Sequence, residues 1–188
     1  MRRDRRGRRR IPLRAGALAA AVAVVGAGFP VQAVPPAEWV EALCTSLTTW
    51  SDDLVQARDD NAVTEGSLDD RRDALVTYLR QVTRDTSALL TQLEEAGIPD
   101  VTDGKAVARA FRRGFRQARA AFADARKAAE NIDTDSRRKF ESALEDIQDA
   151  IIEGADAVNE TFDRASERYD VEALDEAFNS EPACAGIS

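Results

Sequence analysis

The stretch EWVEALCTSLTTW, residues 38–50, sets the interpretation of the whole chain. Its apolar residues recur every three or four positions, which is the spacing of one face of an α-helix. The same face continues past the stretch, so the spacing predicts a helix over residues 36–60, with Pro35 and Pro36 at its start, where proline is tolerated. The apolar positions of this face are Trp39, Leu43, Leu47, Trp50, Leu54 and Ala57.

Three further amphipathic segments follow at the same spacing. The second has Ser67 as its predicted N-cap and ends at Gly97 and Pro99. The third is capped by Thr102 or Asp103, and a short loop separates it from the fourth. Their apolar faces are Leu68, Leu75, Tyr78, Leu79, Val82, Leu89, Leu90 and Leu93; Val107, Phe111, Phe115, Ala118, Phe122, Ala125 and Ala129; and Phe140, Leu144, Ile147, Ile151, Ala155, Val158, Phe162, Ala165 and Tyr169.

Four such helices predict an all-α fold. Short loops make consecutive helices antiparallel neighbours, so we expect an antiparallel four-helix bundle of up-down-up-down order. A further turn or two of helix after Asp170 ends at Asn179, and the tail beyond it is irregular. The alternative is an elongated coiled-coil dimer. We favour a monomeric bundle because each apolar face is wider than a coiled-coil seam.

The beginning of the chain predicts export. Residues 1–14 carry eight arginines and one acid, and residues 15–29 form a short, uncharged apolar run. In the following VQA, residues 31–33, small residues occupy the first and third positions, which are the positions recognised before the cleavage site of a signal peptide. A membrane anchor is the alternative, but a bilayer span needs about 20 apolar residues. We therefore expect a signal peptide at 1–33, a helical domain at 34–188, and no membrane anchor after cleavage.

Charge is distributed unevenly along the chain. The full sequence has 26 Lys+Arg and 34 Asp+Glu, whereas residues 34–188 alone have 18 basic and 33 acidic residues, a net charge of −15. A protein this acidic repels nucleic acid and anionic membranes overall. We therefore expect no nucleic-acid partner.

Basic residues nevertheless gather on one face of the third helix. Residues 105–139 contain 11 basic and 4 acidic residues, and the segments on either side are acidic. One interpretation is a docking face for an anionic polymer or an acidic protein. The other is a solvated face whose field is offset by the acidic neighbours. The candidate face consists of Arg109, Arg112, Arg113, Arg116 and Arg119.

Several classes of site lack their residues. The chain has no histidine and only the initiator methionine, which excludes Ser-His-Asp triads, histidine-ligated zinc and histidine-ligated haem. The carboxylates of the fourth predicted helix share a solvent face, and residues 131–138 depart from the pattern of a calcium-binding loop. No carboxylate falls on an apolar face, where acid–base catalysis would need one. We expect no enzyme activity, no metal and no cofactor.

The two cysteines, Cys44 and Cys184, are expected to form a disulfide. Cys44 lies at the edge of the apolar face of the first helix, without a histidine or a cation to activate it as a nucleophile. Two cysteines do not complete a zinc site by themselves. Export brings the chain to a compartment where disulfides form. The bond would tie the irregular tail across the first helix, near Trp39 and Trp50.

These features together resemble small secreted helical proteins of high-GC Gram-positive bacteria. The resemblance is carried by the arginine-rich start, a composition rich in Ala, Arg, Asp and Val, the first helix with its two tryptophans and Cys44, the break EAGIPD at residues 95–100, and PAC at residues 182–184. It implies a secreted helical protein, and it brings no activity and no functional residues to this chain.

We therefore predict a secreted, non-enzymatic helical-bundle protein. It would bind a protein or polymer partner at or outside the cell envelope. The alternative is binding of a small apolar ligand between helices, which requires a cavity near Trp39, Trp50, Phe111 and Phe162. Solid packing at that place would exclude the alternative.

Overall fold

The computed structural model describes residues 33–62, 66–169 and 171–185, which belong to one compact unit. The predicted signal peptide lies outside these residues except for Ala33. The described part is built from helices, so the all-α prediction is confirmed. The helices are α1 (Pro36–Asp60), α2 (Leu68–Glu95), α3 (Gly104–Glu130), α4 (Arg137–Arg168) and α5 (Glu172–Ser180), followed by a 3-10 turn at Pro182–Cys184.

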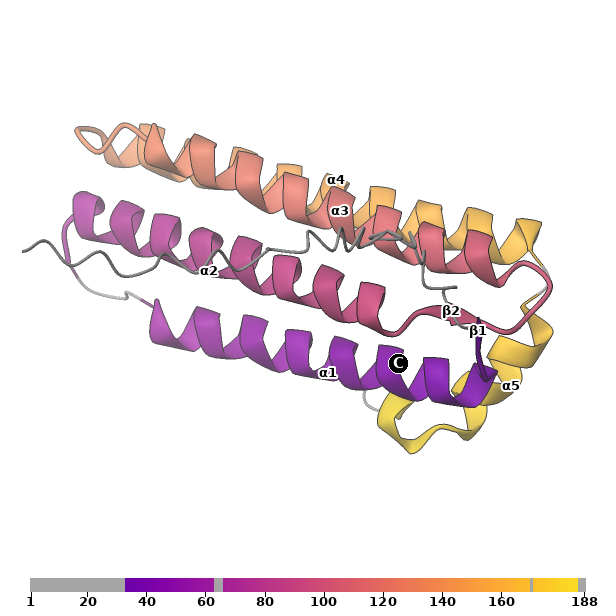
Figure 1. Cartoon of the computed structure of the whole chain (residues 1–188). Helices are drawn as coiled ribbons and strands as arrows, with labels where there is room; N and C mark the ends of the chain where they lie inside the picture. Colours follow the sequence, from indigo (N-terminus) through magenta and orange to yellow (C-terminus); the bar gives the residue numbers. More distant parts are fainter. Residues whose placement is uncertain (1–32, 63–65, 170, 186–188) are drawn as a thin grey trace, which may run out of the picture. The chain divides into compact units, whose positions relative to one another are not determined.

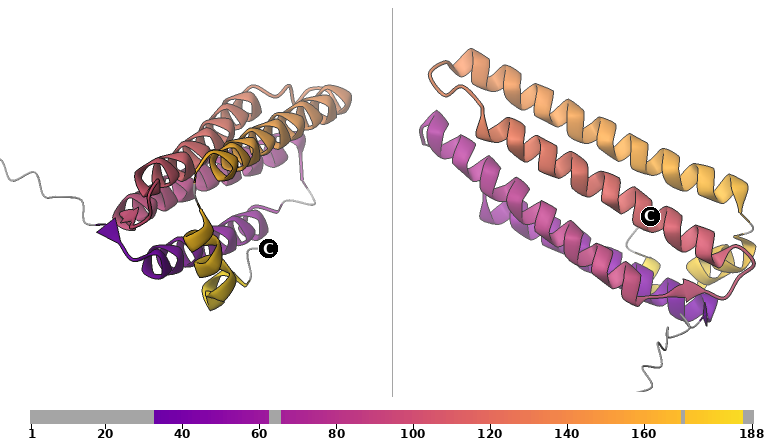
Figure 2. Two further views of the ribbon diagram at one scale, coloured as in Figure 1. Left: turned by 90° about the vertical axis from the view of Figure 1, so that its right-hand side faces the viewer. Right: turned by 45° about the horizontal axis from the view of Figure 1, so that its top comes forward.

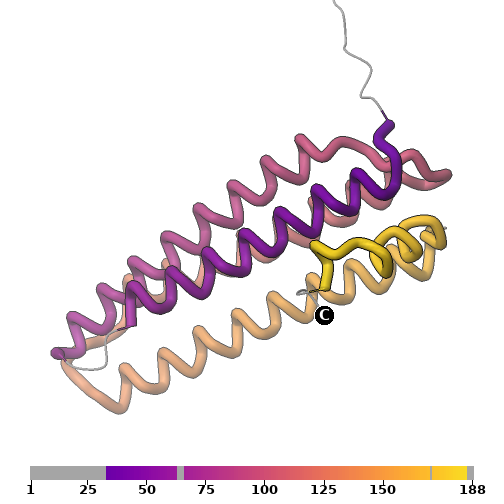
Figure 3. The backbone as a smooth tube through the Cα atoms, turned by 90° about the horizontal axis from the view of Figure 1, so that it is seen from below, coloured from indigo at the N-terminus to yellow at the C-terminus, as the bar shows by residue number. Residues whose placement is uncertain are grey.

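Consecutive long helices lie side by side and run in opposite directions (Figure 1). Helix α2 packs on α1 and α3, and α3 packs on α4. Helix α5 leaves the end of α4 and crosses to pack on α1 (Figure 2). Between α1 and α4 there is almost no direct contact within the described residues, and Figure 3 shows α5 at one end of the space between them.

Local signals explain where α2 begins and ends. Ser67 caps the helix through its side chain, which accepts a hydrogen bond from the Asp70 N–H, while the Asp70 carboxylate accepts one from the Ser67 N–H. Such reciprocal bonds satisfy backbone donors that the first turn leaves free. After the helix, Gly97 adopts a positive φ of 78°, a conformation that glycine enters without steric cost.

One short strand pair was not expected from the sequence. Strand β1 (Ala33–Val34) pairs in parallel with β2 (Ile98–Pro99), and the Asp100 N–H donates to the Val34 carbonyl at 2.7 Å. Two residues are too few to show an alternating pattern, so only the tertiary contact identifies this pair. It fixes the start of α1 against the α2–α3 connection.

The apolar residues form two cores at the two ends of the helices. The first core includes Trp39, Leu43, Leu89, Phe115 and Leu174. Cys44 is also buried in it, and Cys184 packs against it. The second core joins α2, α3 and α4 through side chains that include Val76, Leu79, Ala125, Phe140 and Ile147. Helices α2 and α3 contribute to both cores and connect them.

Candidate functional site

An apolar groove opens between α1 and α4, with α3 as its floor. We call it the α1–α4 groove, and its volume is about 680 Å³. It exists because α1 and α4 do not pack on one another along their length. Its lining residues are Leu47, Thr48, Trp50, Ser51 and Asp52 of α1; Phe111, Phe115, Ala118, Ala121 and Phe122 of α3; Ile151, Gly154, Ala155, Val158, Asn159 and Phe162 of α4; and Phe178 of α5.

Aromatic rings in mutual contact line part of this groove. Phe162 of α4 stacks on Phe111, with ring centroids 4.9 Å apart, and lies 5.8 Å from Phe115. The ring of Trp50 meets Phe115 edge to face at 5.5 Å. Such pairs add stability beyond the area that they bury. The rings therefore hold α1, α3 and α4 in fixed relation around the groove.

A hydrogen bond to α2 orients Trp50. Its indole N–H donates to the Thr86 hydroxyl at 3.1 Å, and that hydroxyl donates in turn to the Val82 carbonyl at 2.8 Å. Thr86 is fully buried, so this acceptor is held in place by the core. The hydrogen bond therefore fixes the plane of the indole, and part of the ring lines the groove.

Trp39 does not line the groove, although the sequence analysis placed it beside the expected cavity. It is buried, and its ring meets Phe111 at 5.5 Å in an edge-to-face contact. The other three residues of that expectation, Trp50, Phe111 and Phe162, do line the groove. Trp39 supports one of the lining rings from within the first core.

Two glycines bring α3 and α4 close together. A Cβ added to Gly114 would lie 2.8 Å from the Phe162 ring, and one added to Gly154 would lie 2.7 Å from the Ala121 Cβ. Both positions therefore depend on the absence of a side chain. Gly114 and Ala121 are seven residues apart and so lie on one face of α3, which we call its small side. Helix α4 packs on this side.

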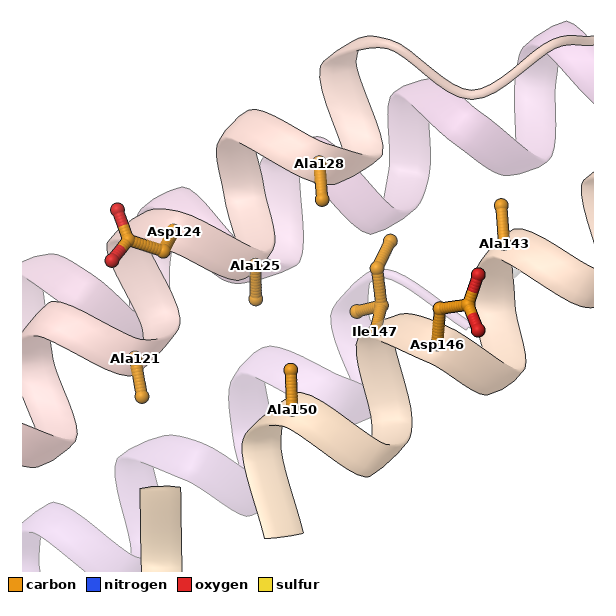
Figure 4. Close-up of a pocket in the computed structure, with 8 residues that line it drawn as sticks. All are labelled: Ala121, Asp124, Ala125, Ala128, Ala143, Asp146, Ile147 and Ala150. Atoms are coloured by element: carbon orange, nitrogen blue, oxygen red, sulfur yellow. The ribbon is translucent and has the colours of Figure 1, made fainter. Parts of the chain in front are cut away.

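A second hollow, of about 380 Å³, lies between α3 and α4 near the second core. Figure 4 shows the methyl groups of Ala121, Ala125 and Ala128 facing Ala150 and the neighbouring turns of α4. The Asp124 carboxylate points away from it (Figure 4) and pairs with Lys127. The hollow follows from small side chains on both helices and offers no converging polar groups.

The predicted disulfide between Cys44 and Cys184 is confirmed, with 5.0 Å between the Cα atoms, a distance in the usual range. It fastens the 3-10 turn to α1. Nearby, the Thr48 hydroxyl donates to the Ala183 carbonyl at 3.5 Å. With the tail held there, α5 lies on α1 and presents Phe178 at the end of the groove.

The arginine face of α3 lies on the surface away from the groove. Within the described residues, none of its five arginines forms an ion pair within 4.0 Å. The ion pairs of α3 join neighbours on the same helix, Arg126 with Glu130 and Lys127 with Asp124. The side chains of the face are Arg109, Arg112, Arg113, Arg116 and Arg119.

One carboxylate is partly desolvated. The side chain of Asp85 on α2 is 16 % exposed, and its Oδ2 atom is buried without a hydrogen-bond partner. Burial raises the pKa of Asp85, the negative charge of Asp53 raises it further, and Arg84 lowers it in part. Asp85 is not among the groove residues. No group of three or more potential metal ligands gathers in the part of the chain that the structure describes.

Sequence reasoning missed most of the groove's rim. Phe178 falls within the short helix expected after Asp170 and was not assigned to a site. Thr48, Ser51, Asp52 and Asn159 fall outside the predicted apolar faces. The sequence shows that these residues lie within one helical turn of lining apolar residues. It does not show the gap between α1 and α4, which is the reason that these residues line a groove.

The chain was compared with protein-family models, with curated proteins and with solved structures. No match was found. Across residues 33–62, 66–169 and 171–185, no helix combines the length and the hydropathy of a bilayer span. The groove and the arginine face are therefore interpreted from their own geometry.

Proposed function

We propose that this protein is an exported, non-enzymatic helical protein that binds a small apolar ligand in the α1–α4 groove. The groove itself carries the proposal. Its volume of about 680 Å³ falls within the roughly 300–1,000 Å³ of small-molecule sites, and apolar and aromatic lining is usual there. In this proposal the four long helices form an up-down-up-down bundle that stays open between its first and last helix.

The lining indicates the chemistry of the ligand. The rings favour an aliphatic or aromatic body, and the polar groups of Thr48, Asp52 and Asn159 suit one polar end. Asp52 and the acidic surroundings disfavour an anion. Val55 and Ile152, both about half exposed, continue the lining faces of α1 and α4 at helical spacing. We therefore expect an elongated, neutral or cationic amphiphile.

Export is the second part of the proposal. Disulfides persist in oxidising compartments and are rare in the cytosol, so the Cys44–Cys184 bond supports a location outside the cytoplasm. The arginine-rich start and residues 15–29 support a cleaved signal peptide. Mass spectrometry of the protein recovered from culture medium tests this. A chain starting at Val34 is expected, and retention of residues 1–33 would contradict it.

A neutral fluorescent probe, N-phenyl-1-naphthylamine, tests the groove. We expect its emission to rise on titration with the disulfide-bonded protein. Ala155→Phe fills the groove from an exposed position on α4 and should weaken binding at least about tenfold, since the added ring occupies the site. Ala88→Phe adds the same ring on exposed α2, away from the groove, and should leave binding unchanged.

The two tryptophans give an independent readout. Trp50 lines the groove and Trp39 does not. A ligand without ultraviolet absorption, such as 1-dodecanol, should therefore shift the emission maximum of a Trp39→Phe variant and leave that of a Trp50→Phe variant unchanged. Equal probe binding by Ala155→Phe and Ala88→Phe, with unchanged helicity, would reject the groove as the site. Absence of probe binding by the unmodified protein would reject the proposal as well.

A further inference from the structure

The arginine face of α3 has a counterpart of opposite charge on α4. The acidic face of α4 consists of exposed carboxylates that form no ion pair within the described residues, unlike Glu141 and Glu160, which pair with Arg137 and Arg164 on the same helix. We call this set the α4 acidic face, and its members are Glu145, Asp149, Glu153, Asp156, Asp163 and Glu167.

The two charged faces point in different directions. Helices α3 and α4 meet through Gly114 and Gly154. At 100° per residue, Arg116 lies about 200° around α3 from Gly114, and Asp156 lies about 200° around α4 from Gly154. Each charged face therefore points away from the neighbouring helix. The two faces are unable to neutralise one another within one molecule.

The charges are spaced alike on both faces. Arg109 is followed by Arg113 and Arg116 at four and seven residues, and Asp149 is followed by Glu153 and Asp156 at the same intervals. Along a helix axis, four and seven residues correspond to about 6 and 10.5 Å. An acidic α-helix therefore matches the arginine face in period. Guanidinium groups also suit carboxylates because they form paired hydrogen bonds with them.

We propose that the arginine face of one molecule binds the α4 acidic face of a second copy. The face has no aromatic side chain to stack on nucleotide bases and no apolar side chain to enter a lipid layer. The α4 acidic face of the same chain has the charge and the spacing that match the arginine face. This inference is independent of the groove and goes beyond the monomer expected from the sequence.

The contact joins different surfaces of the two copies, so it is heterologous. Like faces repel, which excludes a two-fold dimer through the arginine face alone. Such contacts close into a ring or continue as an open chain. The pairs are exposed and individually weak, and the Debye length is about 8 Å at physiological salt. Association should therefore be weak and lost at high salt.

Sedimentation velocity of the disulfide-bonded protein tests the proposal. In about 0.1 M NaCl the sedimentation coefficient should rise with protein concentration, and in about 1 M NaCl the protein should sediment as a monomer, because salt screens exposed charges. The basic-face variant carries Arg109→Glu, Arg113→Glu and Arg116→Glu. The acidic-face variant carries Glu145→Arg, Asp149→Arg and Asp156→Arg. Each alone should stay monomeric, and a mixture of the two should associate.

A control reverses three arginines away from the face, Arg58→Glu, Arg80→Glu and Arg84→Glu, and should associate like the unmodified protein. If the basic-face variant loses helicity, Arg109→Gln, Arg113→Gln and Arg116→Gln replaces it. A monomer at every salt concentration would overturn the proposal, as would association that survives the reversal of charge. Binding of polyphosphate by a protein that does not self-associate would also overturn it and would assign the face to an anionic polymer.

Discussion

At the residue scale, the two tryptophans that flank Cys44 have different roles. Trp39 is 2 % exposed and belongs to the first core, whereas Trp50 is half-buried and lies on the groove. Both lie on the same face of α1, so the spacing of apolar residues in the sequence does not distinguish their roles. They also differ in their indole N–H groups. That of Trp50 donates to the Thr86 hydroxyl of α2, whereas that of Trp39 is buried and has no hydrogen-bond partner among the described residues.

Thr86→Val should leave the Trp50 indole without an acceptor. We expect a loss of about 1–3 kcal/mol in the free energy of unfolding, the usual cost of an unsatisfied buried donor. The specific readout is hydrogen exchange of the Trp50 indole N–H by NMR, which should become faster. Thr86→Ser keeps the hydroxyl and should keep the slow exchange. Equal exchange in the two variants would show that this bond does not hold the ring.

Asp85 gives a residue-scale prediction that depends on pH. Its pKa is raised in the folded state by burial and by Asp53, so the folded protein binds the proton more tightly than the unfolded chain. The destabilisation is absent below the ordinary aspartate pKa and develops as pH rises through the folded value. Asp85→Asn should therefore stabilise the protein at pH 7.

Thermal unfolding followed by circular dichroism tests the Asp85 prediction. The gain from Asp85→Asn should disappear near about pH 3, where the carboxyl group is protonated in both states. Glu94→Gln, at an exposed position on the same helix, is the control for the loss of one negative charge. A gain from Asp85→Asn that persists at acid pH would show that the partly buried charge is not its cause.

At the element scale, the small side of α3 determines how closely α4 approaches. The rigid Ala121 Cβ would meet a Cβ at position 154, whereas the far edge of the Phe162 ring would meet one at position 114. Gly154→Ala should therefore lower the free energy of unfolding by about 1–3 kcal/mol, as overpacking does. Gly114→Ala should cost less, because the ring can tilt toward the groove. Urea unfolding of both variants measures the difference, and the reverse order would contradict this interpretation.

Helix α2 and the groove show how far sequence reasoning reaches. Helix limits follow from neighbours in the chain, such as the cap at Ser67 and the positive φ of Gly97, so they could be predicted. The disulfide followed from two cysteines and the predicted export. The groove depends on which helices fail to meet and on the return of α5 to α1. Spacing along one helix contains no information about either, so Phe178 could not be assigned to the site.

At the scale of the whole molecule, the disulfide belongs to one core only. Cys44 and Cys184 lie in the first core, whereas the second core joins α2, α3 and α4 at the other end. Helix α5 docks mainly on α1 and has no other extensive helix contact among the described residues. Local stability can differ between such regions. The tail should therefore be the part that responds most to reduction.

Hydrogen exchange of the reduced, thiol-blocked protein tests this division. Removing the disulfide should lower global stability by about 2–4 kcal/mol. Beyond that uniform loss, α5 should become fully exchanging, and the part of α1 beneath it should lose protection. Amides near Leu79 and Ala125 in the second core should remain the most protected. A Cys184→Ser variant should give the same pattern without reductant. A region that is held only by the tail should open before the rest of the molecule. An equal loss of protection across all helices would contradict this and would show that the two cores unfold as one cooperative unit.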